Sequence, residues 1–143
     1  MSGSGATDQG AADSSFLVRA SLAPSGTLLA GINYNNPLLS RRDPKTGELR
    51  GVAVDLSRQL AQNVGVGVEL IPYDTAGNLA QAAANVAWDI AFLAIDPARA
   101  TDIEFSPPYL LLEGTYLVRS TSPLRAMEDF DQDGVRIAVT ARS

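Results

Sequence analysis

The sequence predicts an α/β protein with βαβ units and a parallel sheet. Between residues 27 and 95, apolar segments of strand length alternate with segments of helical periodicity. Strands and helices that alternate at such short spacing are typical of βαβ units. The last of these segments, residues 88–95, is almost continuously apolar, as expected of a strand that helices cover on both faces.

The first part of the chain predicts a strand, a hairpin and a helix. Residues 27–34 (TLLAGINY) form a compact apolar strand that follows a Pro-Ser-Gly turn. Residues 35–51 are rich in turn formers and predict a small hairpin or an exposed loop. Apolar residues then recur every four positions, which predicts an amphipathic helix that Gly65 ends. These apolar residues are Val52, Leu56, Leu60 and Val64.

The central part predicts two further strands and a second helix. Residues 66–74 alternate in polarity and indicate a strand, and residues 78–87 are Ala-rich and favour a helix. The apolar run at 88–95 is then the third strand. Asp55 lies at the start of the first predicted helix, and Asp89 lies at the start of the third predicted strand. We therefore interpret both as structural caps rather than paired catalytic carboxylates.

The last part of the chain predicts more strand than helix. Residues 110–120 indicate a longer strand that Gly114 bends, and residues 122–130 a short helix capped by Ser122. Residues 135–139 predict a final strand. A parallel strand is normally followed by a crossover helix, so we expect the chain to stop in the middle of such a unit.

Composition and charge exclude several functional classes. The 143 residues contain neither Cys nor His, which excludes thiol nucleophiles, His-based acid–base catalysis and most zinc sites. The net charge is −5, and the 11 Lys and Arg residues are scattered, which argues against nucleic acid as a partner. No apolar run is long enough to span a bilayer. Residues 1–15 are small and polar and predict a disordered leader, not an intact signal peptide.

Candidate binding residues lie where two of the predicted strands end. Ligands of open α/β sheets bind beyond the carboxyl ends of the strands. Asn33, Tyr34 and Asn36 follow the first strand, and Arg99 follows the third, behind an Asp-Pro pair. A guanidinium can hold a carboxylate through two parallel hydrogen bonds. The alternatives are a surface ion pair between Arg99 and a nearby acid, Asp102 or Glu104, and a purely turn-forming role for the asparagines.

Five segments, in their order and spacing, resemble the bacterial extracytoplasmic solute-binding proteins of family 3, which serve ABC importers of polar amino acids and related compounds. These segments are GTLLAGINYNNP, GVAVDLSRQLAQ, VELIPYD, WDIAFLAIDPARATDIEFSPPYLLLEGTYLV and SPLRAMEDFDQDGVRIAV. The resemblance runs from about residue 22 to residue 143. It implies a periplasmic-binding-protein-like (type II) lobe, one of two that close on a ligand in the cleft between them.

The resemblance also implies a division of the chain and a setting for it. Residues 1–15 would be the leader, residues 16–112 lobe one, and residues 113–143 the hinge crossing and the start of lobe two, where the chain ends. The implied function is that of a periplasmic solute-binding component, which needs no cofactor or metal and meets the membrane subunits of an ABC transporter. Unpaired strand edges in a chain of this length would favour self-association.

The resemblance assigns ligand contacts residue by residue. Arg99 matches the arginine that grips the ligand carboxylate. Ala94 replaces a common Ser or Thr, and Thr75 and Leu38 stand where aromatic residues are frequent. The resemblance therefore implies a carboxylate-bearing metabolite as the ligand, either an amino acid or a related organic acid. The predicted ligand-binding residues are Arg99, Asn33, Tyr34, Asn36, Thr75, Phe92, Leu93 and Ala94.

One alternative on the same fold is an enzyme. Cyclohexadienyl dehydratases resemble these binding proteins, and they require a positioned general acid. The sequence offers no clear candidate for that acid, so we predict a binding protein with no catalytic residues.

Overall fold

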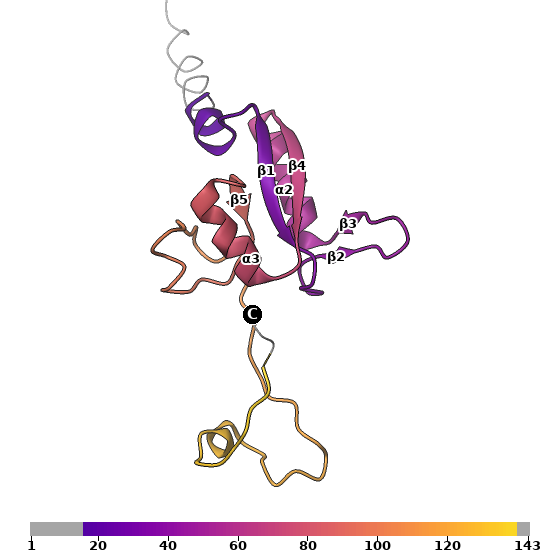
Figure 1. The fold of residues 1–143 in the computed structure, drawn as a ribbon, viewed down its shortest axis with the longest axis vertical. Helices are drawn as coiled ribbons and strands as arrows, with labels where there is room; N and C mark the ends of the chain where they lie inside the picture. The colour runs from indigo at the N-terminus through magenta and orange to yellow at the C-terminus, as the bar shows by residue number, and fades with distance from the viewer. Residues whose placement is uncertain (1–15, 140–143) are drawn as a thin grey trace, which may run out of the picture.

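A computed structural model describes residues 16–139, and its centre is a three-stranded parallel sheet (Figure 1). Strand β1 (Thr27–Asn33) lies in the middle and pairs over its full length with β4 (Gly67–Tyr73). On its other side β1 pairs with β5 (Ile90–Ala91). The predicted α/β class is therefore confirmed. The predicted leader, residues 1–15, lies outside the described residues.

Helix α2 (Val52–Val64) connects β1 to β4 and packs on one face of the sheet. Its end at Gly65 is confirmed, since this glycine takes the left-handed conformation (φ 74°) that favours glycine. The predicted buried stripe is wrong by one position, because Val52 and Leu56 are exposed. The fully buried helix residues are instead Ala53, Val54, Ser57 and Ala61. These smaller side chains let the helix approach the sheet closely.

Helix α3 (Ala76–Gln81) continues into a 3-10 turn, η1 (Ala82–Asn85), and lies against the opposite face of the sheet. The alternation of β1 side chains fixes these two faces. Ala30 and Ile32 belong to the core that includes Ala53 and Val54 of α2. Gly31, which points the other way, faces Leu79 of α3. The sheet is thus covered on both faces, as the sequence predicted.

The turn-rich segment before α2 is a small antiparallel hairpin, as predicted. Its strands are β2 (Arg41–Arg42) and β3 (Leu49–Arg50). Asp43 shapes the connecting turn, because its side chain accepts hydrogen bonds from the backbone N–H groups of Lys45 and Thr46. In Figure 1 this hairpin projects from the body of the protein beside β4.

The elements predicted after the second helix are shorter than expected. The third strand spans two residues, and the segments predicted as strands at 110–120 and 135–139 contain no strand. A strand requires a neighbour to pair with its backbone, and these segments find none among residues 16–139. The predicted helix at 122–130 is a single 3-10 turn, η2 (Met127–Phe130).

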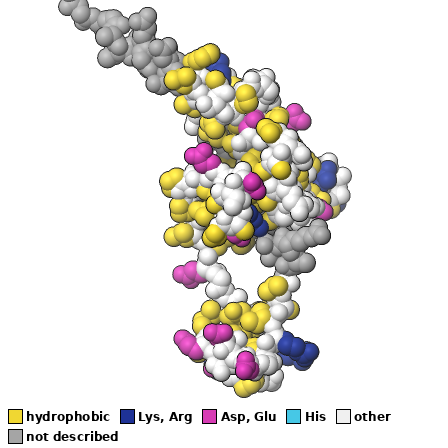
Figure 2. Space-filling view, turned by 60° about the vertical axis from the view of Figure 1, so that its left-hand side comes forward, with side chains coloured by type: hydrophobic (Ala, Val, Ile, Leu, Met, Phe, Trp, Pro, Cys, Tyr) yellow, Lys and Arg dark blue, Asp and Glu magenta, His cyan; other side chains and the backbone are white. Residues whose placement is uncertain are grey.

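The later residues form a smaller part of the molecule below the sheet (Figure 1). Tyr116 and Phe130 stack there with ring centroids 4.0 Å apart. Hydrophobic side chains stay exposed on this part and on the body above it (Figure 2). The most exposed of them are Leu111, Leu117 and Val139.

Candidate functional site

A cavity of about 1090 Å³ opens at the carboxyl ends of β1 and β5. From β1 the chain passes to β4 on one side of β1 and then to β5 on the other side, so the strand order changes side between β1 and β5. Open α/β folds bind their ligands where the strand order changes side in this way. Seven of the eight residues predicted to bind the ligand line this cavity. They are Asn33, Asn36, Thr75, Phe92, Leu93, Ala94 and Arg99.

Arg99 lies half-buried in a turn that follows the third strand. Asp96 shapes this turn: its side chain accepts from the N–H of Ala98, and its carbonyl accepts from the N–H of Arg99. The guanidinium folds back, so that Nη1 donates to the carbonyl oxygen of Ala94 at 3.3 Å. Within residues 16–139 it forms no ion pair with Asp102 or Glu104. Arg99 therefore lines the cavity without pairing with either acid, and the Ala94 carbonyl holds one of its donors.

The loop after β1 uses the oxygens of its asparagines to hold its own shape. The side-chain oxygen of Asn33 accepts from the N–H of Asn35, and that of Asn36 accepts from the N–H of Leu38. Both are Asx turns, the turn-forming role that the sequence also allowed. The remaining polar atom of each side chain is an NH₂ group, which can only donate.

Asn35, which sequence reasoning did not single out, ties this loop to the loop after β4. Its Nδ2 donates to the backbone oxygen of Asp74 at 2.8 Å. The next residue, Thr75, caps α3, and its hydroxyl accepts from the N–H of Asn78. Two loops far apart in sequence are thereby fixed side by side at the rim of the cavity.

Tyr34, the eighth predicted residue, takes a different place from the other seven. Its ring packs against the core formed with Ile32 and Val54. The guanidinium of Arg42 lies 5.6 Å from the centre of the ring, a distance suited to a cation–π contact. Its neighbours are thus the core and the hairpin, and Tyr34 is not among the residues that line the cavity with Arg99.

An aromatic pair forms part of the cavity wall. Phe92 and Tyr109 meet edge to face, with ring centroids 5.8 Å apart and planes at 86°. Burial raises the pKa of the Tyr109 phenol above its ordinary value, because burial favours the neutral form. Tyr109 is not among the residues that the sequence analysis predicted to bind the ligand. An aromatic residue after a Pro-Pro pair carries no signal that distinguishes a cavity wall from a core.

Trp88 and Asp89 hold the third strand in place beneath the cavity. The carboxylate of Asp89 accepts from the N–H of Leu29 at 2.8 Å, and its own N–H donates to the carbonyl of the same residue. The Trp88 indole donates to the carbonyl of Leu79. The contacts of Asp89 are those of a structural residue, as we interpreted it from the sequence.

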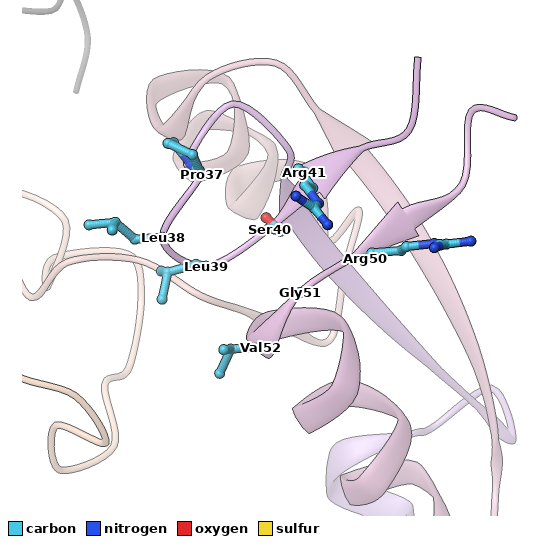
Figure 3. Close-up of a pocket in the computed structure, with 8 residues that line it drawn as sticks. All are labelled: Pro37, Leu38, Leu39, Ser40, Arg41, Arg50, Gly51 and Val52. Atoms are coloured by element: carbon cyan, nitrogen blue, oxygen red, sulfur yellow. The ribbon is translucent and has the colours of Figure 1, made fainter. Parts of the chain in front are cut away.

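A second, smaller pocket of about 200 Å³ lies between the hairpin and the start of α2 (Figure 3). Arg50 extends away from it and pairs with Glu48, at 2.6 Å. Gly51 lines the pocket and has a positive φ of 127°, a conformation that favours glycine. A Cβ here would also lie 2.5 Å from the carbonyl oxygen of Leu39, so a larger residue would not fit.

Among residues 16–139, no group of three acidic residues is placed to hold a metal ion. No helix in that range is long and apolar enough to cross a membrane.

The bacterial extracellular solute-binding proteins, family 3, match residues 28–137 of the chain. Solved structures extend this likeness. An ancestral cyclohexadienyl dehydratase is 30% identical, with a TM-score of 0.55, over 62% of this chain and 37% of its own. An ancestral cationic amino acid solute binding protein is also 30% identical, with a TM-score of 0.55, over 66% and 41%.

Two further neighbours hold a bound amino acid. A point mutant of the arginine-bound form of domain 1 of ArgBP from T. maritima is 26% identical, with a TM-score of 0.54, over 62% of this chain and 69% of its own. A putative binding component of an ABC transporter from Wolinella succinogenes, complexed with lysine, is 28% identical, with a TM-score of 0.54, over 59% and 36%. Apart from the single domain, the chain spans well under half the length of these proteins. No match was found among curated proteins.

Proposed function

Because the chain belongs to the bacterial extracellular solute-binding proteins of family 3, we propose that it captures a small carboxylate-bearing metabolite beyond the carboxyl ends of β1 and β5. A solute-binding role is common to the family. The finer proposal concerns the ligand, and it depends on one observation. The Arg99 guanidinium lies at the reversal of strand order, hydrogen-bonded to the Ala94 carbonyl and without an acidic partner among residues 16–139.

Physical chemistry supports a carboxylate at this place. A guanidinium presents five N–H donors in a planar fork, and the Ala94 carbonyl engages only Nη1. The side-chain NH₂ groups of Asn33 and Asn36 line the same cavity and add further donors. A site rich in donors favours an acceptor-only group such as a carboxylate.

The proposal extends to lobes and partners. We infer that residues 16–112 are lobe one and that residues 113–143 belong to the crossing toward a second lobe, which closes over the ligand. The closed form would then be recognised by the membrane subunits of an ABC transporter, outside the cytoplasm. The arginine-bound single domain of the T. maritima protein supports capture of ligand by first-lobe residues.

Binding calorimetry with a panel of amino acids and organic acids tests this function. We expect at least one carboxylate to bind and Arg99→Ala to weaken that binding at least tenfold, since a hydrogen bond to a charged group contributes about 1.5–3 kcal/mol. Arg41→Ala is the charge-matched control, because Arg41 lines the small pocket of Figure 3 and not the cavity around Arg99. Equal losses in both variants, or no binding across the panel, would refute the proposal.

One neighbour favours a second candidate, an enzyme on the same fold. The ancestral cyclohexadienyl dehydratase is as similar to the chain as the binding proteins are. Such an elimination needs a general acid. Of the three carboxylates that line the cavity, those of Asp74 and Asp89 already accept hydrogen bonds from Asn78 and Leu29, and that of Glu104 is exposed. Incubation with prephenate or arogenate, followed by absorbance of the aromatic product, decides between the two. We expect no aromatisation.

A further inference from the structure

The polar end of the cavity is unbalanced in its hydrogen-bonding groups. Four of its acceptors already accept one hydrogen bond each from this chain: the Thr75 hydroxyl, the side-chain oxygens of Asn33 and Asn36, and the carbonyl of Ala94. Its donors are the guanidinium of Arg99 and the asparagine NH₂ groups. An ammonium group needs acceptors, and a carboxylate needs donors. The imbalance disfavours a ligand with an ammonium group beside its carboxylate.

The acidic residues of the cavity are also engaged. Asp89 accepts from the backbone of β1, and Asp74 accepts from the Asn78 side chain at 2.6 Å. A third acidic residue, Glu104, is exposed. A cationic side chain on the ligand would therefore meet only the second oxygen of a carboxylate that already accepts a hydrogen bond, or reach outward to Glu104.

The wall next to Arg99 is apolar. Phe92 precedes Ala94 by two residues, so its backbone lies within about 7 Å of the carbonyl that Arg99 contacts. Tyr109 stands edge to face against Phe92, and Leu93 and Ile95 line the same cavity. Aromatic rings of this kind bind apolar and aromatic groups by edge-to-face and offset contacts.

We propose that the ligand is a monocarboxylate with an apolar, preferably aromatic, body and without an ammonium group. Its carboxylate lies on Arg99, and its body lies against Phe92 and Tyr109. This inference rests on the proposed function, and it separates this chain from relatives whose structures hold arginine or lysine.

Three matched ligands test the inference by calorimetry on the full chain: 3-phenylpropanoate, L-phenylalanine and L-arginine. The first two differ only in the ammonium group, and the last two only in the side chain. We expect 3-phenylpropanoate to bind at least tenfold more tightly than L-phenylalanine, and L-arginine to bind most weakly. Equal or tighter binding of L-arginine overturns the inference but leaves the proposed function standing. Failure of every carboxylate, in this set and in the wider panel, refutes both.

Two variants check where the aromatic body lies. Phe92→Ala is expected to weaken 3-phenylpropanoate about tenfold, as the loss of an aromatic contact and its buried area predicts. Because Phe92 also packs against the core, Tyr109→Ala serves as the second variant, since Tyr109 is half exposed. Tyr34→Phe is the control. Unchanged affinity in both Phe92→Ala, shown to be folded by circular dichroism, and Tyr109→Ala would contradict the proposed position of the body.

Discussion

Gly31 of β1 lies directly beneath Leu79 of α3, so closely that a Cβ on the glycine would stand 2.5 Å from Leu79 Cδ1. Leu79 is completely buried, and the Trp88 ring closes the same space at 3.1 Å. The helix therefore reaches the sheet at this point only because β1 has no side chain there. This contact holds α3, and with it the Thr75 loop, at the rim of the cavity.

Gly31→Ala should destabilise the fold by about 1–3 kcal/mol, the usual cost of inserting a methyl group into a packed core. Urea unfolding followed by circular dichroism measures it. Gly67→Ala is the matched control, because a Cβ there has ordinary 3.9 Å contacts with Thr27, and we expect a change below about 0.5 kcal/mol. Combining Gly31→Ala with Leu79→Ala should cost less than the sum of the single changes. An additive double variant would show that the two residues do not compete for space.

Asp89→Ala should cost about 1–3 kcal/mol of unfolding free energy, because it leaves the partly buried N–H of Leu29 without an acceptor. Asp89→Asn keeps a side-chain oxygen in reach of that N–H, so its cost should be clearly smaller. Chemical denaturation compares the two variants. Equal costs would mean that the carboxylate charge, and not the hydrogen bond to β1, supports the third strand.

The alternation of polarity and the helical periodicity predicted β1, α2 and β4 because both signals are local. The buried face of α2 could not be predicted in this way. Leu56 is more hydrophobic than Ser57, yet Ser57 is buried because its hydroxyl bonds the Ala53 carbonyl and its small size fits under the sheet. The segment at 110–120 has the composition of a strand. It forms none among the described residues, since strand formation depends on a distant partner that composition does not reveal.

In the candidate site too, some features could be predicted from the sequence and others depend on contacts between distant residues. The position of Arg99 after the third strand follows from topology, and the strand order agrees with it. The hydrogen bond from Arg99 to the Ala94 carbonyl and the pairing of Phe92 with Tyr109 depend on how the chain folds back after residue 95. The periodicity of apolar residues in the sequence does not predict the course of the chain after residue 95. The role of each predicted ligand residue stays a prediction until binding is measured.

Arg99→Lys should weaken binding of the carboxylate ligand nearly as much as Arg99→Ala does. A lysine keeps the positive charge but loses the planar fork that holds both carboxylate oxygens. Calorimetric titration of both variants separates the two contributions. If Arg99→Lys retained full affinity, the guanidinium would act as a point charge, and the bidentate geometry assumed for the site would be wrong.

Trypsin should cleave after Arg119 before it cleaves after Arg58. Arg119 lies in a segment of exposed residues that belongs to no helix or strand, and Arg58 lies within α2. Proteases require an extended, accessible backbone, which a helix packed on the sheet withholds. Mass spectrometry of a digestion time course identifies the first site. Initial cleavage after Arg58 would contradict the proposed boundary near residue 112.

Titration of Tyr109 links the cavity to stability at alkaline pH. Burial raises the pKa of this phenol above 10.0 in the folded protein, and unfolding returns it to the ordinary value. Between these two values the folded chain holds a proton that the unfolded chain has released. The free energy of unfolding should therefore be unaffected by this group below pH 10 and should fall as the pH rises further.

Ultraviolet absorbance of the phenolate follows the titration of the tyrosines, with Tyr109→Phe as the control. In that variant the last part of the tyrosine titration should disappear, and the alkaline loss of stability should become shallower. If the titration curve kept its shape, the late-titrating phenol would be another tyrosine, and the wall beside Phe92 would be more open to water than the edge-to-face contact implies.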